Sequence, residues 1–261
     1  MIENGVWKSR KYQQFREADA DGYIGMRGFL NYFQDAAGGF MHEYDWDNAT
    51  IRERFGAAWV YVKYRMHVYE RADYEGPLSM ECWIEKNRQF AAVTHDVEIA
   101  RDGRLMAEGR LESCVLDLEK GRVTRPERIG FDREKHPIDR KNAVGDFTRI
   151  SPEAEGMREI YRTIVRYTDL DNNRHMTNQR YIPLLQDAFT PEEYEGRYIN
   201  DLEIHYRNQS FYGEELSVYR VEEAKGVHRL VIVKEDHTTA ACARICFSTS
   251  EAAKERRTEA V

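Results

Sequence analysis

Residues 27–36 read RGFLNYFQDA, and residues 179–188 read QRYIPLLQDA, 152 positions later. Two further matches follow in the same order, because residues 75–80 align with 212–217 and Cys114 aligns with Cys246. Several matches in one order indicate an internal duplication, in which the shrinking offset reflects longer loops in the first copy. The chain is therefore expected to contain two related units in tandem.

Each copy begins with a helical pattern of apolar residues, such as Phe29 and Phe33 in the first and Ile182 and Leu185 in the second. Strand-like runs follow the helix, so the sequence predicts an α+β fold in which each antiparallel sheet wraps around its own helix. Pro183 is expected within the first turn of its helix, where a missing N–H does no harm. The predicted strands are 59–69, 78–84, 92–100 and 105–117 in the first copy, and 200–207, 216–222, 228–234 and 240–248 in the second.

A polar motif precedes the second helix: residues 168–178 read TDLDNNRHMTN. Asp171, Asn173 and His175 alternate, and alternate residues of an extended chain share one face. A carboxylate, an amide and an imidazole beside a helix N-terminus suit the splitting of an activated carbonyl. The competing interpretation is that Asp and Asn cap the helix or form a turn, and that the His is an ordinary surface group.

A calcium loop starting at Asp169 is excluded, since it requires Gly and Glu where Arg174 and Arg180 stand. In the first copy, the positions of Asp171, Asn173 and His175 hold Asp19, Asp21 and Tyr23. The first copy thus lacks the amide and the imidazole. We expect one active site per chain, formed by the second copy, with the first copy free to shape a binding cavity.

The bulk composition narrows the function further. The formal charge of −7 argues against nucleic acid as a partner. No apolar run approaches the roughly 18 to 20 residues that span a bilayer, and residues 1–8 lack a secretory signal, so a cytoplasmic location without stable membrane association is expected. The four cysteines and eight histidines show no metal-ligand spacing. Without a phosphate loop, a dinucleotide fingerprint or a nucleophile elbow, we expect neither a cofactor nor a metal.

The Asp-x-Asn-x-His motif followed by Asn178 and Tyr181, the duplicated helix and meander, and Trp59-Val60 at the start of a strand resemble acyl-acyl carrier protein (acyl-ACP) thioesterases. Proteins of that family are built from two tandem hotdog units, and the absence of a chloroplast transit peptide favours the bacterial type. The resemblance implies an N-terminal hotdog domain with the acyl-chain cavity at 1–118, a linker at 119–157, a C-terminal hotdog domain with the catalytic motif at 158–250, and a tail at 251–261.

The resemblance also implies the reaction and its residues. The enzyme would hydrolyse the thioester of fatty acyl-ACP, with Asp171, Asn173 and His175 activating water or attacking the carbonyl. Gln209 and Ser210 follow Tyr206-Arg207-Asn208, where the family places Glu and Cys. Gln209 is included in the catalytic set because its amide could hold a water or the histidine, although it cannot act as a base. The implied substrate contacts are Asn178, Tyr181, Trp59, Phe33 and Phe29.

The implied partner is acyl carrier protein, which is strongly acidic. Residues 120–141 carry eight Lys or Arg against four Asp or Glu, and they either dock the carrier or form an ordinary solvated connection. Alternative functions are an acyl-CoA thioesterase of the hotdog superfamily, a hotdog dehydratase and a non-catalytic acyl-binding hotdog protein. Acyl chain length, saturation and oligomeric state stay open, a homodimer included. The predicted docking residues are Arg122, Arg125, Arg128, Arg133 and Lys135.

Overall fold

The computed structural model describes residues 1–73, 76–86 and 91–249, so the predicted tail at 251–261 lies outside the described residues. The chain divides into two compact units. Unit 1 comprises 1–24 and 28–146, and unit 2 comprises 25–27 and 147–261. The predicted linker is therefore shared, with its part up to Asp146 assigned to unit 1 and its remainder to unit 2.

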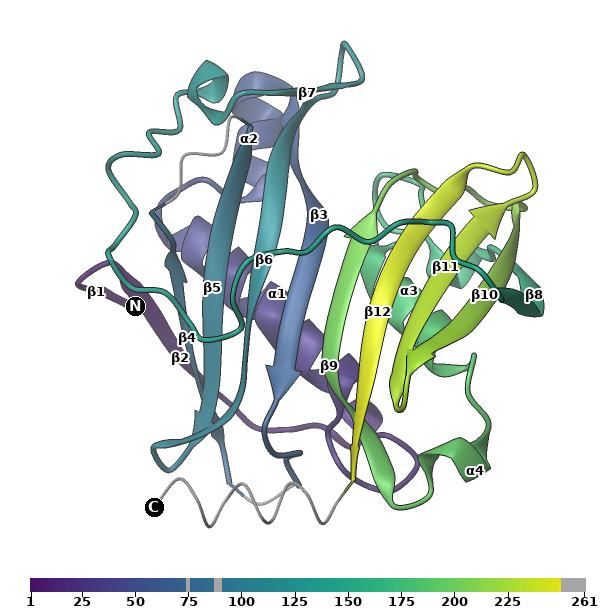
Figure 1. The fold of residues 1–261 in the computed structure, drawn as a ribbon. Coiled ribbons are helices and arrows are strands. Elements are labelled where there is room, and N and C mark those ends of the chain that lie inside the picture. Colours follow the sequence, from purple (N-terminus) through teal and green to yellow (C-terminus); the bar gives the residue numbers. More distant parts are fainter. Residues whose placement is uncertain (74–75, 87–90, 250–261) are drawn as a thin grey trace. The chain divides into compact units, whose positions relative to one another are not determined.

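Unit 1 is an antiparallel sheet that covers one long helix, α1 (Met26–Glu43) (Figure 1). The side chains of Phe29, Phe33 and Phe40 recur on one side of α1 and are fully buried. Gly109 of the sheet lies directly under Phe33, and an added Cβ would overlap that ring and the Arg65 carbonyl. The strands lie in the order β1 (Ile2–Glu3), β2 (Val6–Lys11), β4 (Leu78–Ile84), β5 (Ala92–Arg101), β6 (Arg104–Asp117) and β3 (Ala57–Val68), with β7 (Arg122–Thr124) paired to β6.

Short helices complete unit 1. The α2 helix (Asn48–Phe55) begins at Asp47, whose carboxylate accepts hydrogen bonds from the N–H groups of Ala49 and Thr50, and it ends at the left-handed Gly56. Two 3₁₀ helices are η1 (Phe15–Glu17) and η2 (Pro126–Ile129).

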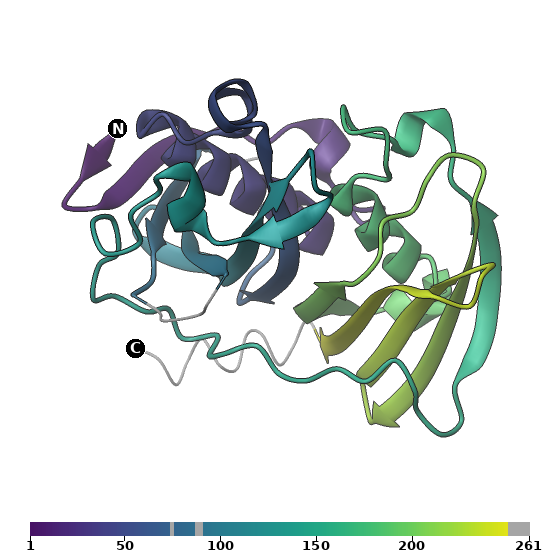
Figure 2. The ribbon, with the colours of Figure 1, turned by 90° about the horizontal axis from the view of Figure 1, so that it is seen from above.

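Unit 2 repeats the plan on a smaller scale. Its antiparallel sheet curves around α3 (Asn178–Gln186), as Figure 2 shows from above. Tyr181, Ile182 and Leu185 form the buried side of α3. The strand order is β9 (Arg197–Tyr206), β12 (Thr239–Thr249), β11 (Val227–Lys234), β10 (Glu215–Ala224) and β8 (Arg158–Ile164), and the short helices are η3 (Tyr167–Asp169) and α4 (Pro191–Tyr194).

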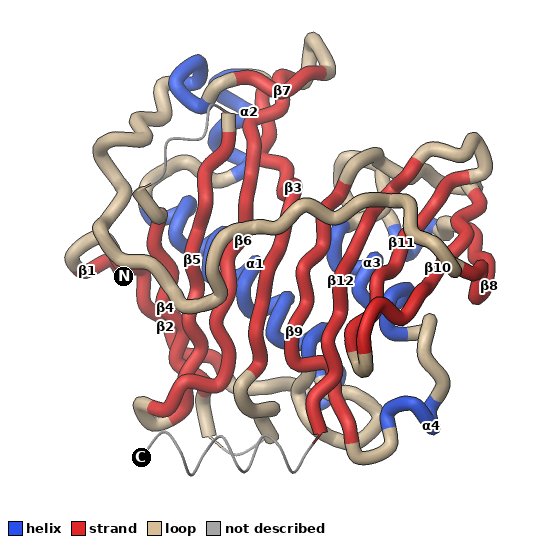
Figure 3. Tube along the Cα trace, viewed as in Figure 1, coloured by secondary structure: helices blue, strands red, loops and turns tan. Residues whose placement is uncertain are grey.

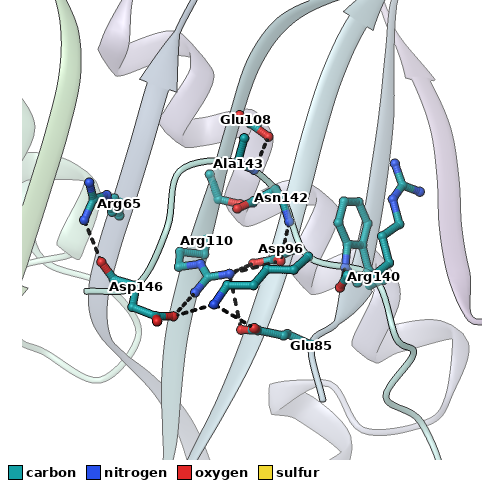
Figure 4. Close-up of polar contacts among 12 residues, drawn as sticks. Arg65, Glu85, Asp96, Glu108, Arg110, Arg140, Asn142, Ala143 and Asp146 are labelled. Atoms are coloured by element: carbon teal, nitrogen blue, oxygen red, sulfur yellow. Dashed lines mark hydrogen bonds and ion pairs between the residues drawn. The ribbon is translucent and has the colours of Figure 1, made fainter. Parts of the chain in front are cut away.

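The linker runs over the outer sheet face of unit 1, the face opposite α1 (Figure 3). Buried carboxylates of the sheet hold it: Asp96 accepts the Asn142 N–H at 3.1 Å, and Glu108 accepts the Ala143 N–H at 3.0 Å (Figure 4). Arg110, itself buried, pairs with Asp96 at 3.1 Å. The buried side chains of Asp96, Glu108 and Arg110 are thus each paired or hydrogen-bonded, as buried charged groups must be.

The continuation of the linker in unit 2 is held in the same manner. The carboxylate of Glu203 accepts the N–H and the hydroxyl of Thr148 at 2.7 and 3.0 Å, and it is 2.8 Å from His205 Nε2. Burial alone would raise the pKa of Glu203, but the hydrogen bonds from His205 and Thr148 hold it below the usual value. Ile150 then packs with Val231 and Cys242 on the outer face.

All eight predicted strands are present, with ends within three residues of the predicted ones. The structure adds β1, β2, β7, β8 and α2, which the apolar patterns of the sequence do not predict. The expectation for Pro183 is wrong, because it is the sixth residue of α3 rather than part of the first turn. The helix ends three residues later, in keeping with the backbone hydrogen bond that proline cannot donate.

Candidate active site

The predicted catalytic motif lies in unit 2, in the loop from β8 to α3, and it forms a tight turn. The Asp171 N–H donates to the His175 carbonyl at 2.9 Å, and the Arg174 N–H donates to the Asp171 carbonyl at 3.0 Å. Arg174 adopts a left-handed φ of 64°, which closes the turn. The convergence of the motif residues is thus confirmed, but its predicted cause is wrong. A hairpin-like turn, and not an extended strand, brings Asp171 and His175 together.

Within this turn, the Asp171 carboxylate lies next to both other polar side chains, Asn173 and His175. Its Oδ2 lies 3.6 Å from His175 Nδ1. Its Oδ1 accepts the backbone N–H of Asn173 at 2.7 Å, and the Asn173 side-chain amide is 3.4 Å from Oδ2. The side chains of Asp171 and His175 are 27% and 14% exposed, so a substrate could reach both. The arrangement offers a carboxylate oriented by donors, beside an imidazole.

The segment after β9 fixes the C-terminal end of the turn. The Met176 N–H donates to the Ser210 carbonyl at 2.8 Å, and His175 forms an isolated β-bridge with Phe211. The hydroxyl of Tyr181, in α3, donates to Ser210 Oγ at 3.0 Å. Burial raises the pKa of the Tyr181 hydroxyl above its usual value, although the hydrogen bond with Ser210 lowers it, so the hydroxyl keeps its proton at neutral pH.

The remaining predicted site residues fall into two groups. Gln209 is exposed and directly precedes Ser210, and Asn178 begins α3 with its carbonyl accepting the Tyr206 hydroxyl at 3.1 Å. Phe29, Phe33 and Trp59 belong to unit 1 and are buried there. The Trp59 indole donates to the Trp46 carbonyl at 2.8 Å. A role of these three in an acyl-chain cavity stays a prediction.

A hollow of about 570 Å³ adjoins the turn of residues 171–175 within unit 2. One wall is formed by the end of β8 and the residues after it. The other wall is formed by residues on one side of α3 and at its C-terminal end. No pattern in the sequence predicts this hollow, because the mostly exposed β8 carries no strand signal. Its lining includes Arg162, Ile164, Val165, Arg166, Thr168, Asp169, Met176, Arg180, Pro183, Leu184 and Asp187.

A second hollow, of about 730 Å³, lies in unit 1 next to β7. Lys120 pairs with Asp117 at 2.9 Å, and Arg133 pairs with Glu127 at 2.5 Å. Five basic and two acidic residues line it, which leaves a surplus of positive charge. We call this the basic groove; it is lined by Asp117, Lys120, Arg122, Val123, Thr124, Arg125, Glu127, Arg128 and Arg133, and so contains four of the five predicted docking residues but not Lys135.

The first copy of the motif keeps the turn but not the chemistry. The Asp19 N–H donates to the Tyr23 carbonyl at 2.9 Å, and the Gly22 N–H donates to the Asp19 carbonyl at 3.0 Å, which repeats the pattern of residues 171–175 at an offset of 152. Here Arg71 pairs with Asp21 and lies 4.8 Å from the centre of the Tyr23 ring. The predicted duplication therefore extends to the backbone of the turn, while an ion pair replaces the amide and imidazole.

Among the residues that the structure describes, no group of three or more His, Cys, Asp or Glu is placed to hold a metal ion. No helix in the described part of the chain has the length and apolar character needed to cross a membrane.

Comparison with known proteins supports the predicted class. The chain matches the structure of an acyl-ACP thioesterase from Bacteroides thetaiotaomicron with a TM-score of 0.85 and 20% identity, covering 94% of this chain and 98% of that one. It matches a 12:0-ACP thioesterase from Umbellularia californica with a TM-score of 0.82 and 13% identity, covering 96% and 100%. No curated protein matches the sequence. The fold is thus the double hotdog of thioesterases.

The sequence also matches a family model. Residues 152–249 match the model of the acyl-ACP thioesterase C-terminal domain, a range that contains the turn of residues 171–175 and Gln209. The C-terminal part of the chain is thus similar to that domain, in line with the predicted resemblance.

Proposed function

We propose that this enzyme hydrolyses fatty acyl-ACP to free fatty acid and carrier protein at the turn of residues 171–175. The observation that carries the assignment is the 3.6 Å approach of Asp171 Oδ2 to His175 Nδ1 within an acyl-ACP thioesterase C-terminal domain. Both groups are partly exposed and lie beside a hollow whose lining includes Met176, the residue after His175.

The reaction needs a nucleophile, a charge-stabilising donor and a proton for the leaving thiolate. Asp171 either takes a proton from water, so that the hydroxide adds to the thioester carbonyl, or adds to that carbonyl itself before water releases the acid. The Asn173 amide orients the carboxylate and the water. His175 orients Asp171 and donates a proton to the sulfur as the carbon–sulfur bond breaks, so that acid and thiol leave.

The start of α3 offers backbone N–H groups that could stabilise the developing negative charge. The structure engages two of them, since the Thr177 N–H donates to the Asp169 carbonyl and the Arg180 N–H donates to the Thr177 carbonyl, both at 2.9 Å.

Substitution of the catalytic pair tests this proposal. We expect Asp171→Asn and His175→Ala each to lower kcat at least roughly tenfold, the low end for a positioned acid or base, with unchanged thermal unfolding. Asp19→Asn is the matched control, since Asp19 occupies the same turn in unit 1 and should leave kcat near the wild-type value. The assay measures thiol release from acyl-ACP and acyl-CoA panels. Wild-type rates in both site variants would refute the assignment.

The basic groove is proposed as the docking surface for the carrier. An acidic carrier would be attracted to a hollow with surplus positive charge on a protein whose overall charge is −7. Arg122, Arg125, Arg128 and Arg133 line the groove, whereas Lys135 does not.

A further inference from the structure

Ser210 connects three parts of the candidate site. Its carbonyl accepts a hydrogen bond from the N–H of Met176, which follows His175 directly. Its side-chain hydroxyl accepts a hydrogen bond from the hydroxyl of Tyr181 in α3. Its neighbours in the sequence are Gln209 and Phe211, and Phe211 forms the bridge with His175. Ser210 thus links the catalytic turn, the first turns of α3 and the segment that carries Gln209.

The hydroxyl pair is buried, with Ser210 0% and Tyr181 2% exposed. The two buried hydroxyls form a hydrogen bond with each other, so removing either one would leave the other without this partner. Phenylalanine and alanine would fill nearly the same space without any polar requirement. Packing alone therefore gives no reason for the pair, whereas a directional hydrogen bond fixes the distance between α3 and residue 210.

A second tyrosine supports the same region. The Tyr206 hydroxyl donates to the Asn178 carbonyl, and the rings of Tyr181 and Tyr206 meet edge to face with centroids 5.3 Å apart. The start of α3 is thereby tied to both the end of β9 and the segment that follows it. This leaves the Tyr181 ring little freedom to turn toward a bound substrate.

We propose that Tyr181 and Ser210 are positioning residues, which hold His175 at its distance from Asp171 through the chain Tyr181–Ser210–Met176. This assignment rests on the proposed function, and it replaces the predicted substrate contact of Tyr181. Misplacing a reacting group by about 1 Å can cost on the order of a hundredfold in rate. Loss of the hydrogen bond between Tyr181 and Ser210 should therefore affect turnover more than substrate binding.

The experiment compares Tyr181→Phe, Ser210→Ala and the double variant. We expect each single variant to lower kcat about tenfold, with KM changed less than about twofold, and the double variant to lose no more than either single one. Ser210→Cys keeps a polar side chain at the junction and should retain more of kcat than Ser210→Ala. Multiplied losses in the double variant would show independent roles and overturn the proposal.

A matched control separates positioning from general stability. The Tyr161 hydroxyl donates to the Leu184 carbonyl at 2.7 Å, so it ties the other end of α3 in the same unit. Tyr161→Phe is expected to lower the unfolding temperature as much as Tyr181→Phe while leaving kcat unchanged. Equal losses of kcat in the two variants would mean that Tyr181 acts only through stability.

A readout without turnover completes the test. The side-chain NMR signal of His175, assigned by its loss in His175→Ala, should shift in Tyr181→Phe and Ser210→Ala but not in Tyr161→Phe. If Asp171→Asn is impaired while Tyr181→Phe and Ser210→Ala keep the wild-type kcat and His175 signal, the positioning roles fail and the catalytic site stands. If Asp171→Asn and His175→Ala keep wild-type rates, the proposed function fails.

Discussion

At the scale of single residues, the turn of residues 171–175 depends on backbone geometry that few residues adopt. Arg174 has a positive φ, which is unusual for a side chain with a Cβ, and the equivalent residue of the first copy is Gly22 with φ 85°. The turn is conserved between the copies although the residue at its left-handed position differs. The left-handed φ of Arg174 therefore costs strain that the glycine of the first copy avoids.

Gln209 is expected to contribute less than the catalytic pair. Its amide is exposed and uncharged, so it can hold a water but cannot take a proton. Gln209→Ala should therefore lower kcat by less than Asp171→Asn does, measured as thiol release from the same acyl-ACP substrate. Equal losses would show that the role given to Asp171 is incomplete.

Asp96 is expected to make the fold less stable as pH rises. Burial raises the pKa of Asp96 to about 6, although Arg110 and the Asn142 N–H lower it. The folded protein then holds this proton at pH values where the unfolded chain, with a pKa of about 3.9, has lost it. Ionisation between about pH 4 and pH 7 should cost up to about 3 kcal/mol of unfolding free energy.

Urea unfolding of the wild type and of Asp96→Asn at several pH values isolates this group, since the variant lacks the titrating carboxyl. The wild type should lose stability relative to the variant from pH 4 to pH 7. A stability difference that stays constant over this range would contradict the raised pKa of Asp96.

At the scale of elements, the two sheets explain why some strands were predictable. The predicted strands lie mostly inside the sheets, where apolar runs mark burial on at least one face. The missed strands β1, β7 and β8 are short or lie at sheet edges, and β2 buries only Val6 and Trp7. In β8, five of seven residues are exposed, so the pattern carried no strong signal. The missed α2 is also short and mostly exposed.

Two adjacent glycines of α1 test how closely the helix packs on unit 1. A Cβ added at Gly39 would overlap the Trp7 ring of β2, whereas one added at Gly38 meets nothing within 4 Å. Gly39→Ala should lower the unfolding free energy by about 1 to 3 kcal/mol, because a packed core resists added volume. Gly38→Ala should raise it by about 0.5 to 1 kcal/mol through helix propensity. Equal stabilities in chemical denaturation would contradict this packing.

At the scale of the whole molecule, the two copies differ in the residues of their turns. Unit 2 keeps Asp171, Asn173 and His175 in its turn, whereas the turn of unit 1 holds Asp19, Asp21 and Tyr23. In unit 1, the Ala72 carbonyl accepts a hydrogen bond from the Ile24 N–H at 2.7 Å, and Arg71 directly precedes Ala72. In unit 2, the Ser210 carbonyl accepts a hydrogen bond from the Met176 N–H, and Gln209 directly precedes Ser210. Arg71 thus occupies the position of Gln209, which supports one active site per chain.

The positive charge of the basic groove predicts how salt affects KM for acyl-ACP. We expect joint reversal of Arg122, Arg125 and Arg128 to Glu to raise KM for acyl-ACP several-fold at low salt, and kcat to stay near the wild-type value. The difference should shrink as salt screens the attraction over about 10 Å at 0.1 M. Lys135→Glu, outside the groove, is the control. An unchanged KM in the triple variant at low salt would place docking elsewhere.

The sequence by itself determined the two-copy plan, the strands inside each sheet and the position of the polar motif that holds Asp171, Asn173 and His175. These depend on repeat spacing, on apolar periodicity and on residues adjacent in the chain, all of which are local properties. Only the tertiary structure decided that a turn brings Asp171 and His175 together, that the linker is fastened by buried carboxylates, and that Tyr181 binds Ser210. Those contacts join residues up to 55 positions apart, as between Thr148 and Glu203, and no local pattern encodes such pairs.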